Sequence, residues 1–316
     1  MDHKTDVTEY LQHLADEFIR EKRYEDAVLL FRKLANMHPD KESYLLMLAW
    51  AYHDGGMKKD AVDCFEQLLA MELERKVFTG FAFDELVRIL KEEEDYERLV
   101  EICERVTAVQ CDDIALLGDL GDAYLAAGKA SRAIEVYRRM TEMEPDASVN
   151  FCHLGNALIA EGNFDGAEEA YQKAIDIDPS EAATYYDRLA GAYVEAGCYE
   201  RAEAALGRCI ENKVNEPAYY SMLGDVLVKQ GRLHDAENAY EKAIALNKDN
   251  GGAYYNRLGN ALAKAGYHLQ AVEIFKKAVA ADPKNPFYYL RLAESYNNLG
   301  LSDMAEKTFH EAEALK

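Results

Sequence analysis

Five polar residues in the C-terminal half of the chain carry side chains that can hold another polypeptide. Asn156 and Asn260 each have an amide that donates and accepts hydrogen bonds, as the backbone of an extended peptide requires. Arg188, Arg257 and Arg291 can each bind a carboxylate through two parallel N–H groups. Arg257 and Asn260 are three residues apart, so they share a face if this segment is helical. These residues predict a patch that recognises an anionic ligand.

Internal pairing is the alternative role for the same arginines. Asp187 and Asp225 occur in the same segments and can neutralise them. Asp225 is therefore a candidate member of the surface in either case, and both interpretations stay open at this point.

Trp50 and His53 form a second candidate group. A tryptophan outside the core stripe can anchor a partner protein, or it can pack against a neighbouring helix. His13 and Asp16 add two metal-ligating side chain types, but ligands three apart on one helix plus a distant His53 do not make a metal site. We therefore expect no bound metal.

The sequence contains no recognisable catalytic motif. A nucleophile elbow, a phosphate-binding loop, a dinucleotide loop after a strand and the H-E-x-x-H zinc motif are all missing. We expect a protein without catalytic residues and without a cofactor.

Charge and composition exclude several classes of partner. The chain has 316 residues with 58 acidic and 36 basic side chains, a net charge of −22. Such an acidic protein is not expected to bind nucleic acid or an anionic membrane surface. The longest apolar run, 44–52, is about half of the roughly 20 residues that span a bilayer, so we expect no membrane insertion. No secretory leader is recognisable at the start, and six scattered cysteines without C-x-x-C pairs are typical of reduced thiols, so we expect a cytoplasmic location.

A repeat of 34 residues organises the chain. Its clearest marker is an alanine that recurs every 34 or 35 residues, at Ala27, Ala61, Ala133, Ala167, Ala202, Ala236, Ala271 and Ala305. One gap of 72 residues holds two repeats and four extra residues, with Leu99 in place of the alanine. When this residue is numbered position 20, position 7 is leucine in all nine repeats, position 8 is small in eight, and position 24 is mostly aromatic. Spacings of three and four place positions 4, 7, 8 and 11 on one face of a first helix, and positions 20, 24 and 27 on one face of a second.

Glycine and proline mark the ends of these helices. Glycine at position 15 ends the first helix in seven repeats, at Gly56, Gly128, Gly162, Gly197, Gly231, Gly266 and Gly300. Proline at position 32 follows the second helix at Pro39, Pro145, Pro179 and Pro283. Tyrosine pairs occupy positions 3 and 4 in repeats 6 to 9. We expect the second tyrosine of each pair to be the core residue, and the first to pack between neighbouring repeats with its hydroxyl in solvent.

This pattern resembles the tetratricopeptide repeat family over residues 8–316, and the segment 150–179 is close to the family's ideal. The resemblance implies an all-α fold, a right-handed superhelical solenoid of about nine helix-turn-helix repeats that forms a single domain over 1–316. The repeats are predicted at 8–41, 42–75, 80–113, 114–147, 148–181, 183–216, 217–250, 252–285 and 286–316. Repeat 3 is degenerate, and the extra residues 76–79 before it predict a change of superhelix geometry and a lengthened second helix in repeat 2.

The resemblance also implies where a ligand binds. In the family, positions 2, 5, 6, 9, 12 and 13 of the first helices line a concave groove. That assignment places the following candidates in the groove: Trp50, His53, Asn156, Arg188, Asp225, Arg257, Asn260 and Arg291. The two-carboxylate clamp by which some members bind chaperone C-termini does not fit, since Cys152, Arg188, Ala218 and Met222 stand where its residues are needed.

A non-catalytic protein–protein interaction scaffold or adaptor is the function that the resemblance implies. It would bind a peptide or a helical segment of a partner protein in the groove. The alternative is a self-assembling structural scaffold, in which a second copy covers an apolar edge at Leu11, Leu14 and Phe18. Homo-oligomerisation stays open, and an enzyme is not expected.

Overall fold

The fold is all-α, and a computed structural model describes residues 3–213 and 215–315. No strand occurs within those two ranges. The predicted array also includes residues 1, 2, 214 and 316, which lie outside the described residues. The chain divides into two compact bodies, residues 1–144 and 145–316, here called the N-terminal body and the C-terminal body.

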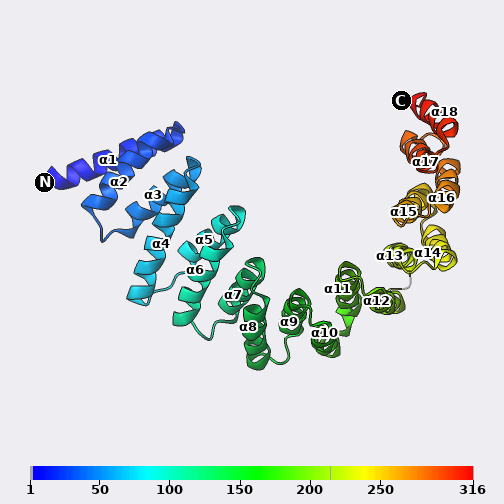
Figure 1. Cartoon of the computed structure of the whole chain (residues 1–316). Helices are drawn as coiled ribbons and strands as arrows, with labels where there is room; N and C mark the ends of the chain where they lie inside the picture. Colours follow the sequence, from blue (N-terminus) through cyan, green and yellow to red (C-terminus); the bar gives the residue numbers. More distant parts are fainter. Residues whose placement is uncertain (1–2, 214, 316) are drawn as a thin grey trace. The chain divides into compact units, whose positions relative to one another are not determined.

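The N-terminal body consists of eight helices among its described residues. They are α1 (His3–Arg20), α2 (Tyr24–Met37), α3 (Glu42–Asp54), α4 (Lys58–Arg75), α5 (Phe81–Glu92), α6 (Tyr96–Val109), α7 (Ile114–Ala126) and α8 (Ala130–Met143). Each odd-numbered helix packs against the even-numbered helix that follows it (Figure 1). The predicted helix pairs of repeats 1 to 4 are confirmed.

The C-terminal body contains ten α-helices and two short 3₁₀ turns in the part that the structure describes. The α-helices are α9 (Ser148–Glu161), α10 (Phe164–Ile177), α11 (Ala182–Glu195), α12 (Tyr199–Asn212), α13 (Pro217–Lys229), α14 (Leu233–Leu246), α15 (Gly251–Lys264), α16 (His268–Ala281), α17 (Pro286–Asn298) and α18 (Ser302–Glu313). The turns are η1 (Pro179–Glu181) and η2 (Lys248–Asn250). Within this body the first helices of the pairs lie on one side of the row and the second helices lie on the other (Figure 1). We call the surface of α9, α11, α13, α15 and α17 the first-helix face.

A left-handed residue ends the first helix of every repeat. All seven predicted glycines at position 15 have positive φ, between 70° and 87°. In repeats 1 and 3 the same place is taken by Lys22 and Glu94, with φ of 59° and 56°. A side chain in this conformation costs roughly 1 kcal/mol more than glycine, so the turn geometry is kept there at the expense of local stability.

The second helix of repeat 2 is longer than its counterparts, as predicted. α4 has 18 residues, whereas α2 and α6 have 14. It ends at Arg75, the next residue Lys76 has the left-handed conformation, and the remaining extra residues form the connection to α5. The change of superhelix geometry at 76–79 and the single solenoid over the whole chain stay predictions.

Two expectations about packing are wrong. In repeats 6 and 9 the first tyrosine of the pair is the buried one: Tyr185 and Tyr288 are buried, whereas Tyr186 and Tyr289 are partly exposed. Tyr185 does pack between neighbouring repeats as expected: it stacks on the Tyr171 ring of α10, with 5.6 Å between the ring centroids, because position 3 faces the second helix of the preceding repeat.

The predicted apolar edge on α1 is also largely covered. Leu11 is buried, Leu14 and Phe18 are half-buried, and the Arg23 guanidinium lies over the Phe18 ring at 4.2 Å. The exposed apolar side chains of α1 are Val7 and Tyr10.

Candidate protein-interaction site

Glycine at position 8 lets a tyrosine of the second helix reach across the first helix of its own repeat to position 9. In repeats 4, 5 and 7 a Cβ added to this glycine would lie 2.4 to 2.8 Å from the tyrosine ring, closer than real contacts allow. The pairs are Gly121 with Tyr137, Gly155 with Tyr171 and Gly224 with Tyr240. Each ring is fully buried, but its hydroxyl donates a hydrogen bond to an Asp or Asn at position 9, namely Asp122, Asn156 and Asp225.

An arginine of the next repeat binds the same position-9 residue in two of these repeats. We call each set of tyrosine, Asp or Asn and arginine a bridge. In the first bridge, Tyr171 donates to Asn156 Oδ1 at 2.5 Å, and Arg188 donates to the same oxygen at 3.2 Å. Arg188 also contacts Cys152 Sγ, the position-5 side chain of repeat 5, at 3.2 Å. The first bridge therefore joins α9, α10 and α11.

The second bridge has the same layout with a stronger acceptor. Tyr240 donates to Asp225 Oδ1, and Arg257 donates from Nε and from a terminal nitrogen to Oδ2 at 2.9 and 2.7 Å. The position-5 side chain is Ser221, whose hydroxyl oxygen accepts from Arg257 at 3.2 Å. Burial is the main cause that raises the pKa of Tyr240 above its usual value, and the neighbouring Asp225 carboxylate is the second. This hydroxyl therefore stays protonated and remains a donor.

The corresponding set in repeats 8 and 9 is incomplete. Phe275 packs against Gly259 as the tyrosines pack against theirs, but it has no hydroxyl to donate. No hydrogen bond to the Asn260 side chain occurs among the described residues. Arg291 turns to Glu294 on its own helix at 2.7 Å and lies 4.7 Å above the Phe287 ring. We call Phe275, Asn260 and Arg291 the incomplete bridge.

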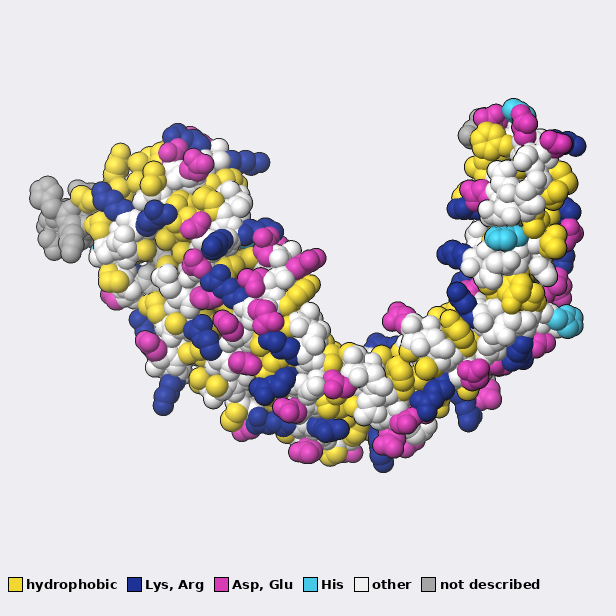
Figure 2. Space-filling view, in the orientation of Figure 1, with side chains coloured by type: hydrophobic (Ala, Val, Ile, Leu, Met, Phe, Trp, Pro, Cys, Tyr) yellow, Lys and Arg dark blue, Asp and Glu magenta, His cyan; other side chains and the backbone are white. Residues whose placement is uncertain are grey.

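A pocket of about 460 Å³ opens beside the incomplete bridge. α13 and α15 supply its lining, which is Asp225, Lys229, Asn256, Arg257, Asn260, Ala261 and Lys264. The Asp225 carboxylate is already bound by Arg257, so Lys229 and Lys264 leave the pocket electropositive. Figure 2 shows Lys and Arg side chains in dark blue along the edge of the helices that carry this face.

The Trp50 ring is part of an aromatic cluster in the N-terminal body. It meets Phe65 of α4 edge to face at 5.8 Å and lies 6.4 Å from Phe81 at the start of α5. His53 lies against the same indole at 5.4 Å, and its ring nitrogens lie within 3.2 Å of Asp54 and Arg88. The structure thus gives Trp50 the packing role that the sequence left open, and use of this cluster by a partner stays a prediction.

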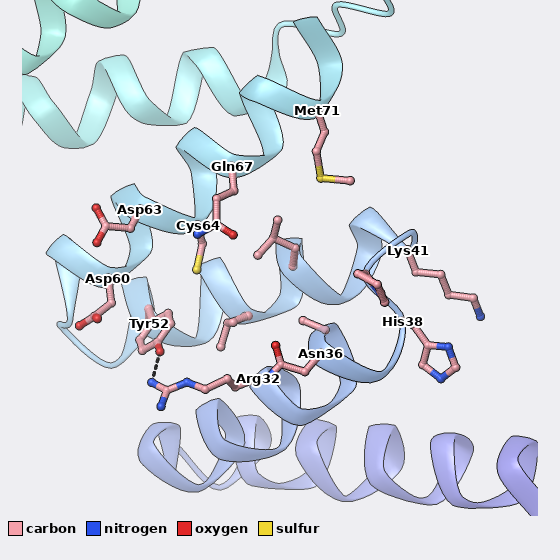
Figure 3. Close-up of a pocket in the computed structure, with 14 residues that line it drawn as sticks. Arg32, Asn36, His38, Lys41, Tyr52, Asp60, Asp63, Cys64, Gln67 and Met71 are labelled. Atoms are coloured by element: carbon pink, nitrogen blue, oxygen red, sulfur yellow. Dashed lines mark hydrogen bonds between the residues drawn. The ribbon is translucent and has the colours of Figure 1, made fainter. Parts of the chain in front are cut away.

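A second pocket, of about 430 Å³, lies between α2, α3 and α4 (Figure 3). Arg32 and Lys41 line it together with Asp60 and Asp63, so its walls carry both signs of charge. Burial raises the pKa of the Cys64 thiol to about 11, so this cysteine is protonated and is not a nucleophile at neutral pH. This pocket does not select one class of ligand.

Metal binding and membrane crossing find no support in the described part of the chain. It contains no cluster of His, Cys, Asp and Glu that could coordinate a metal ion. None of its helices has the length and apolarity needed to cross a bilayer.

The structure separates the three candidate arginines. Arg188 and Arg257 have internal partners, and the expected pairing of Arg257 with Asp225 is present. Asp187 has no ion pair within the described ranges, and its buried Oδ1 has no hydrogen bond. The pKa of this carboxyl is raised, and burial is the main cause. Arg291 alone of the three is held by a residue of its own helix.

Four residues of the site were not identified from the sequence. Lys229 and Lys264 occupy position 13 and Asn256 occupies position 5, so a full reading of the groove positions would have found them. Phe275 was seen only as an aromatic residue at position 24, and the missing hydroxyl was the informative signal.

Comparisons with known proteins agree with this architecture. The family of the cilia and flagella-associated protein 70 C-terminal domain matches residues 82–316, and a tetratricopeptide repeat family matches residues 43–71. No curated protein matches the chain.

One solved structure matches the fold with a TM-score above 0.5, and two others match with lower scores. The C-terminal part of a TPR repeat-containing protein from Cytophaga hutchinsonii is 17% identical with a TM-score of 0.51, over 73% of this chain and 92% of that one. MamA is 27% identical with a TM-score of 0.38, over 51% of this chain and 94% of that one. The Cut9–Hcn1 hetero-tetramer structure of the APC/C gives 15% identity and a TM-score of 0.41, over 98% of this chain and 73% of that one. The nine predicted repeats, the helix pairs that the structure describes and the family match over most of the chain agree with one another. The chain belongs to the tetratricopeptide repeat family of the cilia and flagella-associated protein 70 C-terminal domain.

Proposed function

We propose that this chain is a non-catalytic interaction scaffold that binds an extended segment of a partner protein on the first-helix face of its C-terminal body. The observation that carries the proposal is the electropositive pocket on α13 and α15, with amide and ammonium groups directed to it from a rigid helical support. Preformed helices bind an extended segment at a lower entropic cost to the scaffold than a mobile surface would.

The family name supports a cellular setting. Its reference protein is described as associated with cilia and flagella. We propose that this chain acts in the same setting, as a single solenoid that presents its first helices to other proteins.

Selection from a random library of 12-residue peptides tests the proposed function. We expect enriched peptides that compete with one another and that lose binding when Lys229 and Lys264 are both changed to Glu. The matched control changes Lys59 and Lys173, which lie on second helices, to Glu as well. This control variant should bind the peptides as the parent chain does. Failure to enrich any peptide, or peptides that bind the Lys229/Lys264 variant equally well, would contradict the proposal.

Self-assembly is a second candidate, and the exposed apolar residues at the outer helices favour it. Val7 and Tyr10 of α1 are 46% and 66% exposed, and Met304 and Phe309 of α18 are 46% and 45% exposed. Sedimentation velocity over a hundredfold concentration range should show an increasing mass if a second copy covers these residues. A constant monomer mass would remove this candidate.

A further inference from the structure

We infer that Asn256, Asn260 and Arg291 form the anchor subsite of the first-helix face and that its ligand is an acidic, extended segment of a partner protein. The two asparagine amides meet the backbone of this segment, and the Arg291 guanidinium binds one of its side chain carboxylates. This inference rests on the proposed function and names the residues and the ligand chemistry within it.

Two buried polar atoms without partners carry the inference. The Asn256 side chain buries its Oδ1 without a hydrogen-bond donor, and Arg291 buries its Nε without an acceptor. Buried polar groups are nearly always paired, so an orphaned acceptor and an orphaned donor mark a place where hydrogen bonds are still to be made. A peptide group supplies an N–H for the oxygen, and a carboxylate supplies an acceptor for the guanidinium.

Repeat symmetry relates these atoms to one subsite. In both complete bridges the arginine at position 6 binds the position-9 and position-5 side chains of the preceding repeat. Arg291 occupies position 6, and Asn260 and Asn256 occupy positions 9 and 5 of the preceding repeat. α15 packs against α17 as α13 packs against α15. The three residues therefore correspond to the complete bridges position by position, but they lack the internal contacts.

The local pairing of Arg291 is weak enough for a ligand to replace. Its partner Glu294 is three residues along the same helix, and 60% of the Glu294 side chain is exposed. Exposed pairs of this kind contribute little to stability, since water and salt screen them. In contrast, Arg257 is held by a carboxylate that also accepts from a buried tyrosine. A ligand carboxylate therefore competes for Arg291 with a solvated partner only.

The local charge selects an acidic ligand. Lys229 and Lys264 both occupy position 13, beside the subsite. The same position in the other repeats of the C-terminal body holds Ala160, Glu195 and Asn298. Basic groups are thus concentrated on α13, α15 and α17 of a protein whose net charge is −22. Phe287, 43% exposed beneath the Arg291 guanidinium, offers an apolar surface to the same segment.

Fluorescence anisotropy with three labelled octapeptides tests the inference. In the first peptide Ser alternates with Glu, in the second with Gln and in the third with Lys; we call them the Glu, Gln and Lys peptides. Each carries fluorescein. We expect the Glu peptide to bind the full chain most tightly, with an affinity that falls as salt rises. Arg291→Ala should weaken its binding at least tenfold, whereas Glu294→Gln, which frees Arg291, should strengthen it two- to fivefold.

Arg208→Ala is the matched control, because Arg208 also pairs with a glutamate three residues along its own helix but lies on the second helix α12. It should change the affinity less than twofold, and circular dichroism should show equal helicity in all three variants. If the Glu peptide binds but Arg291→Ala leaves its affinity unchanged, or if the Gln or Lys peptide binds more tightly, the inference is wrong while the proposed function stands. If none of the peptides binds and the library yields none either, the proposed function itself fails.

Discussion

The second bridge and the incomplete bridge occupy neighbouring repeats and differ in two side chains. Repeat 7 supplies Tyr240 and Asp225, and repeat 8 supplies Phe275 and Asn260 at the same positions. In the first case a hydroxyl and an arginine both bind the carboxylate, and Arg257 is held in place. In the second case neither contact is made among the described residues, and Arg291 turns to Glu294. Repeat 8 thus leaves out an internal contact that repeat 7 makes, and this is where we propose that the ligand binds.

The largest expected effect comes from filling the space through which the tyrosine of a complete bridge passes. A Cβ on Gly224 would lie 2.4 Å from the Tyr240 ring, so Gly224→Ala must displace that ring and break the second bridge. We expect a loss of about 1–3 kcal/mol in the free energy of unfolding, typical of overpacking. Thermal unfolding followed by circular dichroism measures it.

Gly191→Ala is the control for this change. Gly191 is also in a first helix, but an added Cβ would meet nothing within 4 Å. This substitution should stabilise the protein by up to about 1 kcal/mol through helix propensity. Equal melting temperatures for the two variants would show that the glycine at position 8 is not needed for close packing.

Removing one hydroxyl converts a complete bridge toward the incomplete one. Tyr240→Phe deletes the donor to Asp225 but keeps the ring, and we expect it to destabilise the protein by about 1 kcal/mol. Phe31→Leu in the N-terminal body, a large-to-small change at a buried ring that we expect to cost on the order of 1 kcal/mol or more, calibrates the measurement. An unchanged unfolding midpoint for Tyr240→Phe would mean that the bridge contributes no stability.

Repeat 4 of the N-terminal body has an acid at position 6 in place of the arginine of repeats 6, 8 and 9, and the stability of the protein should depend on pH because of it. This acid is Asp119, and burial is the main cause that raises the pKa of its carboxyl. Lys91 opposes the shift, and the neighbouring acids add to it: Asp122, Asp84 and Asp113. The folded state therefore binds this proton more readily than the unfolded state, so Asp119 removes stability as the pH rises above about 4. Asp119→Asn should melt at a higher temperature than the parent chain at pH 7, and the difference should vanish at pH 3. A difference that persists at pH 3 would exclude titration of Asp119 as its cause.

Thiol reactivity gives the smallest and most local signal. Cys152 is buried in the first bridge against Arg188, and burial chiefly raises its pKa, whereas Cys111 is exposed. Under native conditions iodoacetamide should therefore label Cys111 well before Cys152, as peptide mass spectrometry would show. Equal labelling rates would mean that the first bridge opens readily.

Sequence periodicity was sufficient to predict the helices, because each repeat uses the same few apolar positions. The glycines at position 15 predicted seven of the nine helix-ending turns. Lys22 and Glu94 were missed because the left-handed geometry there is imposed by the repeats and not by the residue type. The contact of Tyr185 with the preceding repeat was expected, but its burial was not, because the periodicity of one helix does not show how deeply a contact with the preceding repeat buries a ring.

The candidate arginines could be named from the sequence, but their roles could not. Arg188, Arg257 and Arg291 share one position, and their contacts depend on the side chains at positions 24 and 9 of the preceding repeat. Each set of contacts joins three helices, so the sequence of one helix does not reveal it. The structure does, because the hydroxyls of Tyr171 and Tyr240 donate hydrogen bonds to Asn156 and Asp225 on the first-helix face.

Phe275→Tyr tests the central claim most directly, because it supplies the hydroxyl that the incomplete bridge lacks. The new tyrosine should donate to Asn260, as Tyr171 donates to Asn156, and raise the free energy of unfolding by about 1 kcal/mol. With Asn260 occupied, the affinity for the alternating Glu–Ser peptide should fall at least threefold. Peptide binding that stays at the parent affinity in a stabilised Phe275→Tyr protein would contradict the account.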